Sequence, residues 1–300
     1  MDTEKYKVLL RAVDTGSFTA AAEELGYTPS GVTHMMNALE EDLGLTLLHR
    51  SRHGVALTEA GKDLIEPMRR LVAEADHLDE SVSELLGMER GHVAVASGAS
   101  FARYMLPEAI ARFHERYPKI TLELSELGGA EMRAMVAEHR IGMAFLTRRE
   151  SDTNFISLCS DDMLAIVPED SPLAQKSSVA LKDLEAYPYI GVHPDYDHDV
   201  EDIIRSWEYG QHPLMISRDE QTVMAMVREG LGVSIVAGLH VAFYDGGIAG
   251  IPLEPRYVRD VGIAIVSKDG LSPAERKFLE VTREVVGELI GDGVVDPPLQ

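Results

Sequence analysis

The chain has 300 residues, of which 45% are hydrophobic and 26% charged, and its formal net charge at pH 7 is −22. This composition is typical of a globular protein with hydrophobic cores, and the length is sufficient for two or three domains. No run of about 18 apolar residues occurs and the start, MDTEKYK, lacks an apolar signal region, so we expect a cytoplasmic protein with no membrane partner.

The first 43 residues predict a supporting helix and a helix-turn-helix. Apolar residues recur at helical spacing from residue 5 to residue 13 (Tyr6, Leu9, Leu10, Val13). Residues 18–25 predict a second helix, with Ser17 as its N-cap and Gly26 at its end. Thr28 is an N-cap for a third helix, and Pro29 suits its first position because the missing N–H is harmless there. We therefore expect the helix-turn-helix over about residues 18–37.

The third helix, expected over residues 29–43, has two different faces. One is an apolar stripe of Val32, Met36, Leu39 and Leu43. The opposite face has hydroxyl, imidazole and amide groups but no carboxylate, so phosphates and base edges can approach it without repulsion. Our predicted DNA contacts here are Thr28, Pro29, Ser30, Thr33, His34 and Asn37. The alternative is the polar outside of an ordinary three-helix core.

A short hairpin ends this segment, with its turn near Gly54 and with Arg50 and Arg52 close to that turn. We predict that these two arginines contact DNA phosphates. Residues 1–90 contain nine Lys and Arg but seventeen Asp and Glu, so we expect modest DNA affinity from one chain and a need for oligomerisation. The alternative is an exposed basic hairpin without a partner.

Residues 58–86 predict one long helix of roughly 40 Å, with Pro67 bending or loosening its first turns. Its apolar residues follow steps of four and three: Leu64, Met68, Leu71, Ala75, Leu78, Val82 and Leu85. A small N-terminal module cannot cover such a seam, so we predict a homodimer through this helix, with two reading heads for two half-sites, and pairing of dimers into a tetramer. The alternative is that the seam packs against the C-terminal part of the same chain.

From residue 91 strands and helices alternate, which predicts a βαβαβ unit with a parallel sheet and then a second α/β lobe. Cys159, the only cysteine, excludes an internal disulfide and is expected to be buried and unreactive. The predicted fold class is α/β with an all-α-type winged helix-turn-helix domain over residues 1–57, a linker helix and hinge over 58–90, and a two-lobed, periplasmic-binding-protein-like domain over 91–300. Lobe I is expected over 91–161 and 268–300, and lobe II over 162–267.

Three segments resemble one known family. SFTAAAEELGYTPSGVTHMMNALEEDLGLTLLHRSRHGVALTEAG is similar to the winged helix-turn-helix of LysR-type transcriptional regulators. ASFARYMLPEAIARFHERYPKITLEL and VREGLGVSIVAG resemble the two lobes of the effector domain of that family. The chain departs from the family pattern at His34, where Arg is frequent, at Met35, which is usually polar or basic, and at Gly142, which is generally Asp. The resemblance implies a DNA-binding regulator controlled by a small molecule held between the lobes.

The effector site is expected where strands end and helices begin. The junction VASGASF offers hydroxyls and free N–H groups to a carboxylate or another anion. The resemblance adds the end of the third strand, at Thr147, and the facing lobe. The predicted effector residues are Ser97, Ser100, Phe101, Thr147, His193 and Thr222. For each hydroxyl the alternative is a plain helix cap.

The sequence gives little indication of metal binding, catalysis or a cofactor. Asp195, Asp197 and Asp199 begin like a calcium loop, but Val200 stands where Gly is required and Ser206 where the bidentate Glu should be, so we predict no metal site. No nucleophile elbow, P-loop, zinc-protease or dinucleotide motif occurs, and we predict neither an enzyme nor a cofactor. The rival function is a solute-binding protein or an α/β enzyme with an unrelated helical N-terminus.

Overall fold

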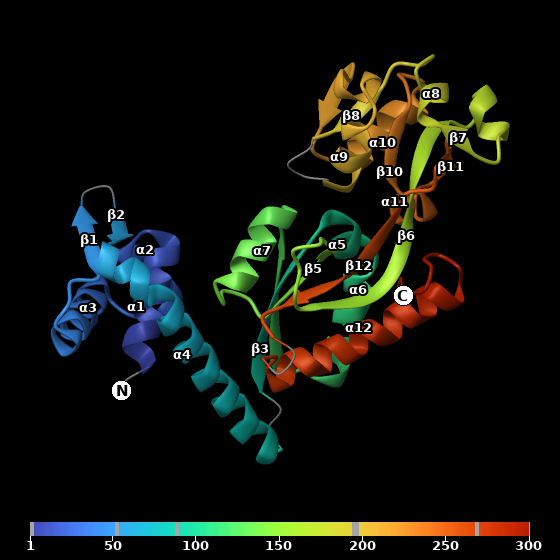
Figure 1. Ribbon diagram of the computed structural model, residues 1–300. Coiled ribbons are helices and arrows are strands. Elements are labelled where there is room, and N and C mark those ends of the chain that lie inside the picture. Colours follow the sequence, from blue (N-terminus) through green and yellow to red (C-terminus); the bar gives the residue numbers. More distant parts are fainter. Residues whose placement is uncertain (1–2, 52–53, 88–89, 194–197, 268–269, 300) are drawn as a thin grey trace. The chain divides into compact units, whose positions relative to one another are not determined.

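The computed structural model describes residues 3–51, 54–87, 90–193, 198–267 and 270–299 (Figure 1). Its contacts divide the chain into two units, which we describe separately. Unit 1 comprises residues 1–88 with 137–140, and unit 2 comprises the remainder.

Unit 1 contains the predicted helix-turn-helix, and local capping explains where its helices begin. Ser17 accepts a hydrogen bond from the Ala20 amide, and Thr28 accepts one from Gly31. Gly26 has a φ of 72°, the left-handed conformation that ends a helix. The elements are α1 (Thr3–Thr15), α2 (Phe18–Leu25), α3 (Pro29–Leu43), β1 (Leu48–Ser51), β2 (Gly54–Leu57) and α4 (Glu59–Leu85). The three predicted helices and their caps are thus confirmed.

The apolar stripe of α3 closes the core of unit 1. Val32, Met36 and Leu39 are buried there among side chains from α1 and α4. Leu43, expected on the same stripe, is 36% exposed because it lies in the last turn of α3, outside that core. β1 and β2 pair antiparallel, with Leu48 opposite Leu57, and so form the wing.

Helix α4 forms one continuous helix, as predicted, with Pro67 inside it. Only the first half of its apolar seam meets the core of unit 1, through Leu64, Met68 and Leu71. In the single chain the second half is open, with Leu78 65%, Val82 47% and Leu85 88% exposed. An exposed apolar row of this kind is typical of a surface that packs against another protein segment.

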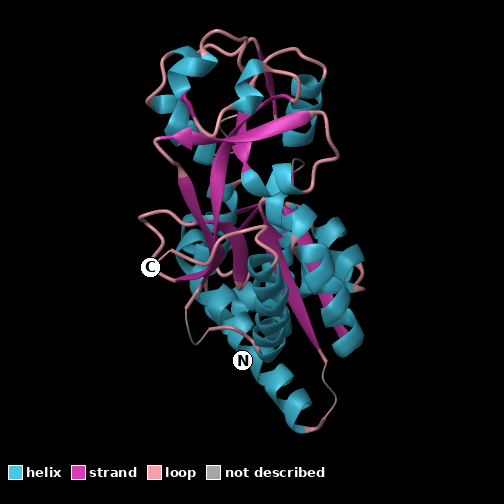
Figure 2. Ribbon diagram, turned by 90° about the vertical axis from the view of Figure 1, so that its right-hand side faces the viewer, coloured by secondary structure: helices cyan, strands magenta, loops and turns pink. Residues whose placement is uncertain are grey.

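Lobe I of unit 2 is a sheet with helices on both faces. β3 (Gly91–Ser97), β4 (Ile120–Glu126) and β5 (Met143–Thr147) are parallel, as predicted. One face packs against α5 (Ala99–Tyr104), α6 (Leu106–Arg116) and α12 (Pro273–Gly291), and the other against α7 (Gly129–Ala137). Figure 2 shows the strands of this unit flanked by helices.

The two lobes are joined by strands that run in opposite directions. β6 (Phe155–Pro168) pairs with β12 (Val258–Ile265) along its first half. Along its second half it pairs with β10 (Ser234–Ala237) and β11 (Ile248–Glu254). β12 lies between β5 and β6, antiparallel to both. The expected boundary at residue 267 was therefore wrong for residues 258–265, because pairing on both edges places β12 in lobe I. Among the described residues, eight strands form this sheet.

Lobe II surrounds the far half of β6. Its cores gather around Trp207 and Tyr189 on one side and around Val223 and Met224 on the other. Its elements are β7 (Val179–Ala180), α8 (Leu181–Leu184), β8 (Ile190–Val192), α9 (His198–Arg205), β9 (Met215–Ser217), α10 (Glu220–Arg228), β10 (Ser234–Ala237), α11 (Gly238–Ala242) and β11 (Ile248–Glu254). None of the described helices combines the length and apolarity needed to cross a membrane.

Candidate functional site

The face of α3 opposite the core is polar and open. Thr28, Pro29, Ser30, His34 and Asn37 are exposed, and Thr33 is half-buried. The Thr33 hydroxyl donates to the Pro29 carbonyl at 2.9 Å, and the Thr28 hydroxyl oxygen lies 3.1 Å from that of Ser30. The structure thus brings the six residues predicted from α3 and its N-cap together on one surface.

Arg50 lies against this surface and does not project freely from the wing. Its guanidinium donates to the Asn37 amide oxygen at 2.6 Å and to the Glu40 carboxylate at 2.7 Å, and it lies 5.3 Å from the centre of the Phe18 ring. The side chain is 33% exposed, so one edge of the cation remains open to solvent. Arg52, the second predicted phosphate contact, lies outside the described residues.

Glu40 connects the wing to α3. One of its carboxylate oxygens accepts from the backbone amides of Leu47 at 2.7 Å and Leu48 at 3.0 Å, while the other holds Arg50. The first carboxylate after the polar face of α3 is therefore fully engaged within the protein. It fixes the hairpin at one angle to the helix and holds Arg50 beside Asn37.

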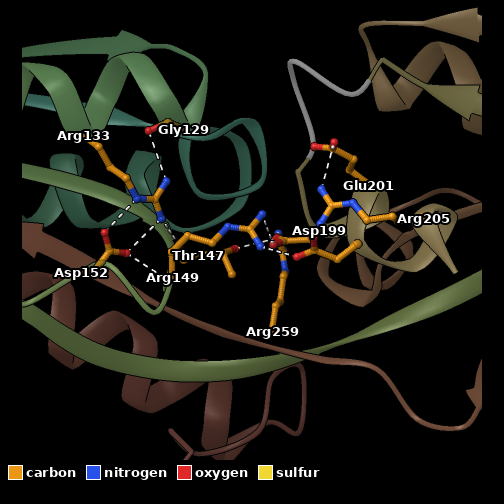
Figure 3. A network of polar contacts seen from close by, with 10 residues as sticks. Gly129, Arg133, Thr147, Arg149, Asp152, Asp199, Glu201, Arg205 and Arg259 are labelled. Atoms are coloured by element: carbon orange, nitrogen blue, oxygen red, sulfur yellow. Dashed lines mark hydrogen bonds and ion pairs between the residues drawn. The ribbon is translucent and has the colours of Figure 1, made fainter.

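A second candidate site lies between the lobes of unit 2. Adjoining cavities of about 70 Å³ and 650 Å³ share four lining residues, Thr147, Arg149, Asp199 and Arg259. Figure 3 shows these side chains converging from the end of β5 and the loop after it, from α9 and from β12. The cleft is thus lined by both signs of charge.

Arg259 is the most enclosed cation of the cleft, with 9% of its side chain exposed. It donates to the Asp161 carboxylate at 2.7 and 3.0 Å and to the Ser100 hydroxyl at 3.1 Å. Asp161 also accepts from the Leu239 amide at 3.1 Å, so β6, β12 and α11 meet at one ion pair. These contacts fix the guanidinium in orientation as well as in position.

Asp199 brings a carboxylate from lobe II into contact with lobe I. The Thr147 hydroxyl donates to it at 2.7 Å, and the guanidinium groups of Arg149 and Arg259 lie 3.4 and 3.7 Å away. Arg149 also donates to Asp202, one turn further along α9, at 2.5 Å. The network in Figure 3 therefore joins the two lobes.

His240 lines the smaller cavity and is 2% exposed. Burial lowers the pKa of its imidazole to about 3, and the positive charges of Arg259 and Arg103 act in the same direction, so the ring is neutral at pH 7. Within the described part of the chain, its Nδ1 atom has no hydrogen-bond partner. A buried ring nitrogen of this kind can serve a bound ligand.

The sequence-predicted effector residues divide into two groups. Ser100, Phe101 and Thr147 line the smaller cavity. Ser97, His193 and Thr222 line neither of these two cavities, and their assignment as effector contacts stays a prediction. The Ser97 hydroxyl donates to the Gly98 carbonyl, and the Thr222 hydroxyl donates to Asp219 at the start of α10. His193 follows β8, and its backbone amide donates to the Ser217 carbonyl at 2.8 Å.

Sequence reasoning missed much of the cleft lining, namely Arg133, Arg149, Asp199, Glu220, His240 and Arg259. One signal was available, because Arg259 and Asp260 are two charged residues in a strand that is otherwise apolar. Asp195 and Asp197 of the rejected calcium loop lie outside the described residues. Within the described ranges, no cluster of three or more His, Cys, Asp or Glu side chains could hold a metal ion.

The comparisons with known proteins decide the family. Residues 87–287 match the model of the LysR substrate binding domain, and residues 3–62 match that of the bacterial regulatory helix-turn-helix protein, lysR family. The chain belongs to the LysR family of transcriptional regulators. The predicted family, fold class and regulatory function are thereby confirmed.

LysR-family relatives and structures span nearly the whole chain. The uncharacterized HTH-type transcriptional regulator YbhD of Escherichia coli is 31% identical over 92% of this chain and 89% of its own. The uncharacterized HTH-type transcriptional regulator YvbU of Bacillus subtilis is 28% identical over 96% and 99%. Full-length OxyR C199D of Pseudomonas aeruginosa has the same fold, with a TM-score of 0.73 at 21% identity over 95% of this chain and 97% of that one. CbnR, a LysR family transcriptional regulator, aligns with a TM-score of 0.59 at 22% identity over 95% and 99%.

Proposed function

We propose that this LysR-family regulator reads specific sites on duplex DNA with the polar face of α3, under the control of a small-molecule effector held between lobes I and II. The carboxylate-free face of α3, with Arg50 held beside Asn37, carries the DNA part of the proposal. Amide and hydroxyl groups supply the donors and acceptors that base edges require in the major groove. The proposed DNA contacts are Thr28, Pro29, Ser30, Thr33, His34, Asn37, Arg50 and Arg52.

The second half of α4 supports a dimer. Leu78, Val82 and Leu85 form an exposed apolar row that a second copy of the same helix can cover. Two chains joined in this way present two reading heads to two half-sites, and pairing of dimers gives a tetramer. CbnR has been solved in complex with its target DNA, in a structure that aligns with this chain with a TM-score of 0.52. We propose no catalytic activity or cofactor, and we place the action of the protein in the cytoplasm, where its DNA target lies.

The proposed effector contacts are Ser100, Phe101, Thr147, Arg149, His240 and Arg259. They offer two cations, hydroxyl donors and one neutral imidazole to a small polar ligand. A ligand at this place changes DNA binding only if it binds one arrangement of the lobes more tightly than the other. We therefore expect the effector to alter the spacing or the bend that paired dimers impose on DNA.

DNase footprinting on the DNA upstream of the gene tests the DNA part of the proposal. The full-length protein should protect a defined site, and Asn37→Ala should weaken protection by about tenfold because one base contact is lost. Gln211→Ala removes an exposed amide from lobe II and is the matched control, with an expected footprint like that of the wild type. Equal protection by wild type and Asn37→Ala would refute the assignment of α3 as the reading surface.

A further inference from the structure

The cleft already contains a carboxylate in the place that suits an anionic ligand. Asp199 projects from α9 of lobe II, and its side chain is 13% exposed. It accepts from Thr147 at 2.7 Å and faces Arg149 and Arg259 (Figure 3). A hydroxyl and two guanidinium groups around one carboxylate form the donor set expected for a bound carboxylic acid.

The lobe I side of this donor set is held by contacts of its own. Arg259 is fixed by Asp161 and Ser100. Arg133 donates to the Thr147 carbonyl at 2.6 Å and to both oxygens of Asp152 at 2.8 and 3.0 Å, which secures the end of β5. Arg259 and the backbone of Thr147 therefore have contacts that do not depend on Asp199, and donors held in this way bind a replacement at little cost in conformational entropy.

We propose that Asp199 is an internal competitor for the effector, and that the effector carries a carboxylate that takes its place between Thr147, Arg149 and Arg259. This inference rests on the proposed function, since it assumes that the effector binds between the lobes. Asp199 holds α9 of lobe II against lobe I while the cleft contains no effector. Its displacement frees α9 and thereby couples ligand binding to the relative position of the lobes.

Asp202 provides the internal comparison. It lies on the same helix and pairs with Arg149, but its side chain is 52% exposed. In the part of the chain that the structure describes, its ion pairs are with Arg149 and Arg205, and not with Arg259. Removal of Asp202 therefore deletes a carboxylate of equal charge without emptying the enclosed donor set. A general effect of charge on anion binding would appear equally in both variants, whereas competition for the donor set is specific to Asp199.

Chemical rescue with formate tests the proposal on the full chain. Asp199→Ala removes one carboxylate group, and formate has the size and charge of the group removed. We expect formate to stabilise Asp199→Ala in thermal unfolding with a saturable dependence and an affinity about tenfold higher than for wild type, which is the weight of one charge-assisted hydrogen bond. Sodium chloride keeps the ionic strength constant, so general screening does not contribute.

Three further variants complete the test. Asp202→Ala should bind formate no more tightly than wild type, and the double variant Asp199→Ala with Arg259→Gln should lose the gain. Asp199→Asn keeps the shape of the side chain and serves if Asp199→Ala does not fold, with a gain of a few-fold expected. Equal formate affinity in wild type and folded Asp199 variants would overturn the proposal. No DNA is present in this measurement. A negative result with formate therefore contradicts the role of Asp199, whereas a negative result in DNase footprinting contradicts the proposed reading of DNA by α3.

Discussion

Glu40 should be the residue on which the geometry of the winged helix-turn-helix depends most. Its carboxylate accepts from two buried backbone amides, those of Leu47 and Leu48, and from Arg50, while its own side chain is only 15% exposed. Glu40→Ala removes these three contacts together and leaves two amides at the base of the wing without their acceptor. An amide that loses a charged acceptor in a largely buried place costs folding free energy.

The size of the effect follows from these contacts. Each amide hydrogen bond to the Glu40 carboxylate contributes about 1.5 kcal/mol to the free energy of unfolding, which is the lower end of the range for charged acceptors. Loss of both in Glu40→Ala therefore lowers that free energy by about 3 kcal/mol. The Arg50 ion pair adds less than about 1 kcal/mol because a third of that side chain is exposed to solvent. Glu40→Gln keeps one oxygen for the amides but loses the ion pair, so we expect the free energy of unfolding to fall by about 1 kcal/mol.

Hydrogen exchange of the segment containing Leu47 and Leu48 measures the effect locally. Loss of about 3 kcal/mol corresponds to exchange faster by roughly 150-fold in Glu40→Ala. Arg50→Ala, which leaves both amides bonded to Glu40, should change this exchange by less than about fivefold. DNA affinity should fall in both variants, because Glu40→Ala loses the fixed position of Arg50 beside Asn37 and Arg50→Ala loses the cation itself. Exchange in Glu40→Ala within threefold of the wild-type rate would refute this account of the wing.

Four further outcomes are expected. Arg50→Ala should weaken DNA binding about tenfold and lower the slope of log affinity against log salt by about one in gel-shift titrations, whereas Arg50→Lys should keep the slope. Thr28→Ala should lower the free energy of unfolding by about 1 kcal/mol in chemical denaturation, because α3 loses its N-cap. The pKa of His240 is about 3 when folded and near 6.5 when unfolded, so the unfolded chain binds more protons between these values. Stability should therefore fall by up to about 1.4 kcal/mol per pH unit below pH 6, and His240→Gln should flatten that dependence in denaturation followed by Trp207 fluorescence. Burial raises the pKa of the Cys159 thiol to about 12, so the native protein should resist iodoacetamide, which should label it only after denaturation.

The helix-turn-helix could be predicted because the sequence signals for its helix ends act over a few residues. Ser17, Gly26, Thr28 and Pro29 each stabilise a helix end within about one turn of themselves, so their effect is visible in the sequence. The partners of Arg50 could not be predicted in the same way. Asn37 and Glu40 lie 13 and 10 residues away, and they meet Arg50 only after the hairpin folds back on α3.

The cleft is assembled over still longer separations. Thr147 meets Asp199 across 52 residues, and Arg259 meets Ser100 across 159. The rule that ligands lie beyond the ends of strands predicted Ser100 and Thr147, which line the cleft in lobe I, but none of the residues that line it in lobe II. There the cleft is lined by the start of α9, by Glu220 at the start of α10 and by His240 of α11, whereas His193 after β8 and Thr222 of α10 line neither cavity. The position of the second lobe on the sheet, which decides this, depends on β12 returning between β5 and β6.

The net charge of −22 affects the two sites in opposite ways. In the cleft, arginines are held by carboxylates of the same chain: Arg133 by Asp152, Arg149 by Asp199 and Asp202, and Arg259 by Asp161. An incoming anion must therefore compete with a resident carboxylate, which makes its affinity sensitive to single substitutions such as Asp199→Ala. On α3 the protein leaves carboxylates out of the exposed face and ties the nearest one, Glu40, to the wing. On the proposed function, DNA therefore meets a surface without carboxylates beside the partly exposed cation of Arg50. Its affinity then comes from directed hydrogen bonds, from that cation and from the joining of two DNA-binding domains, because the overall charge opposes non-specific attraction.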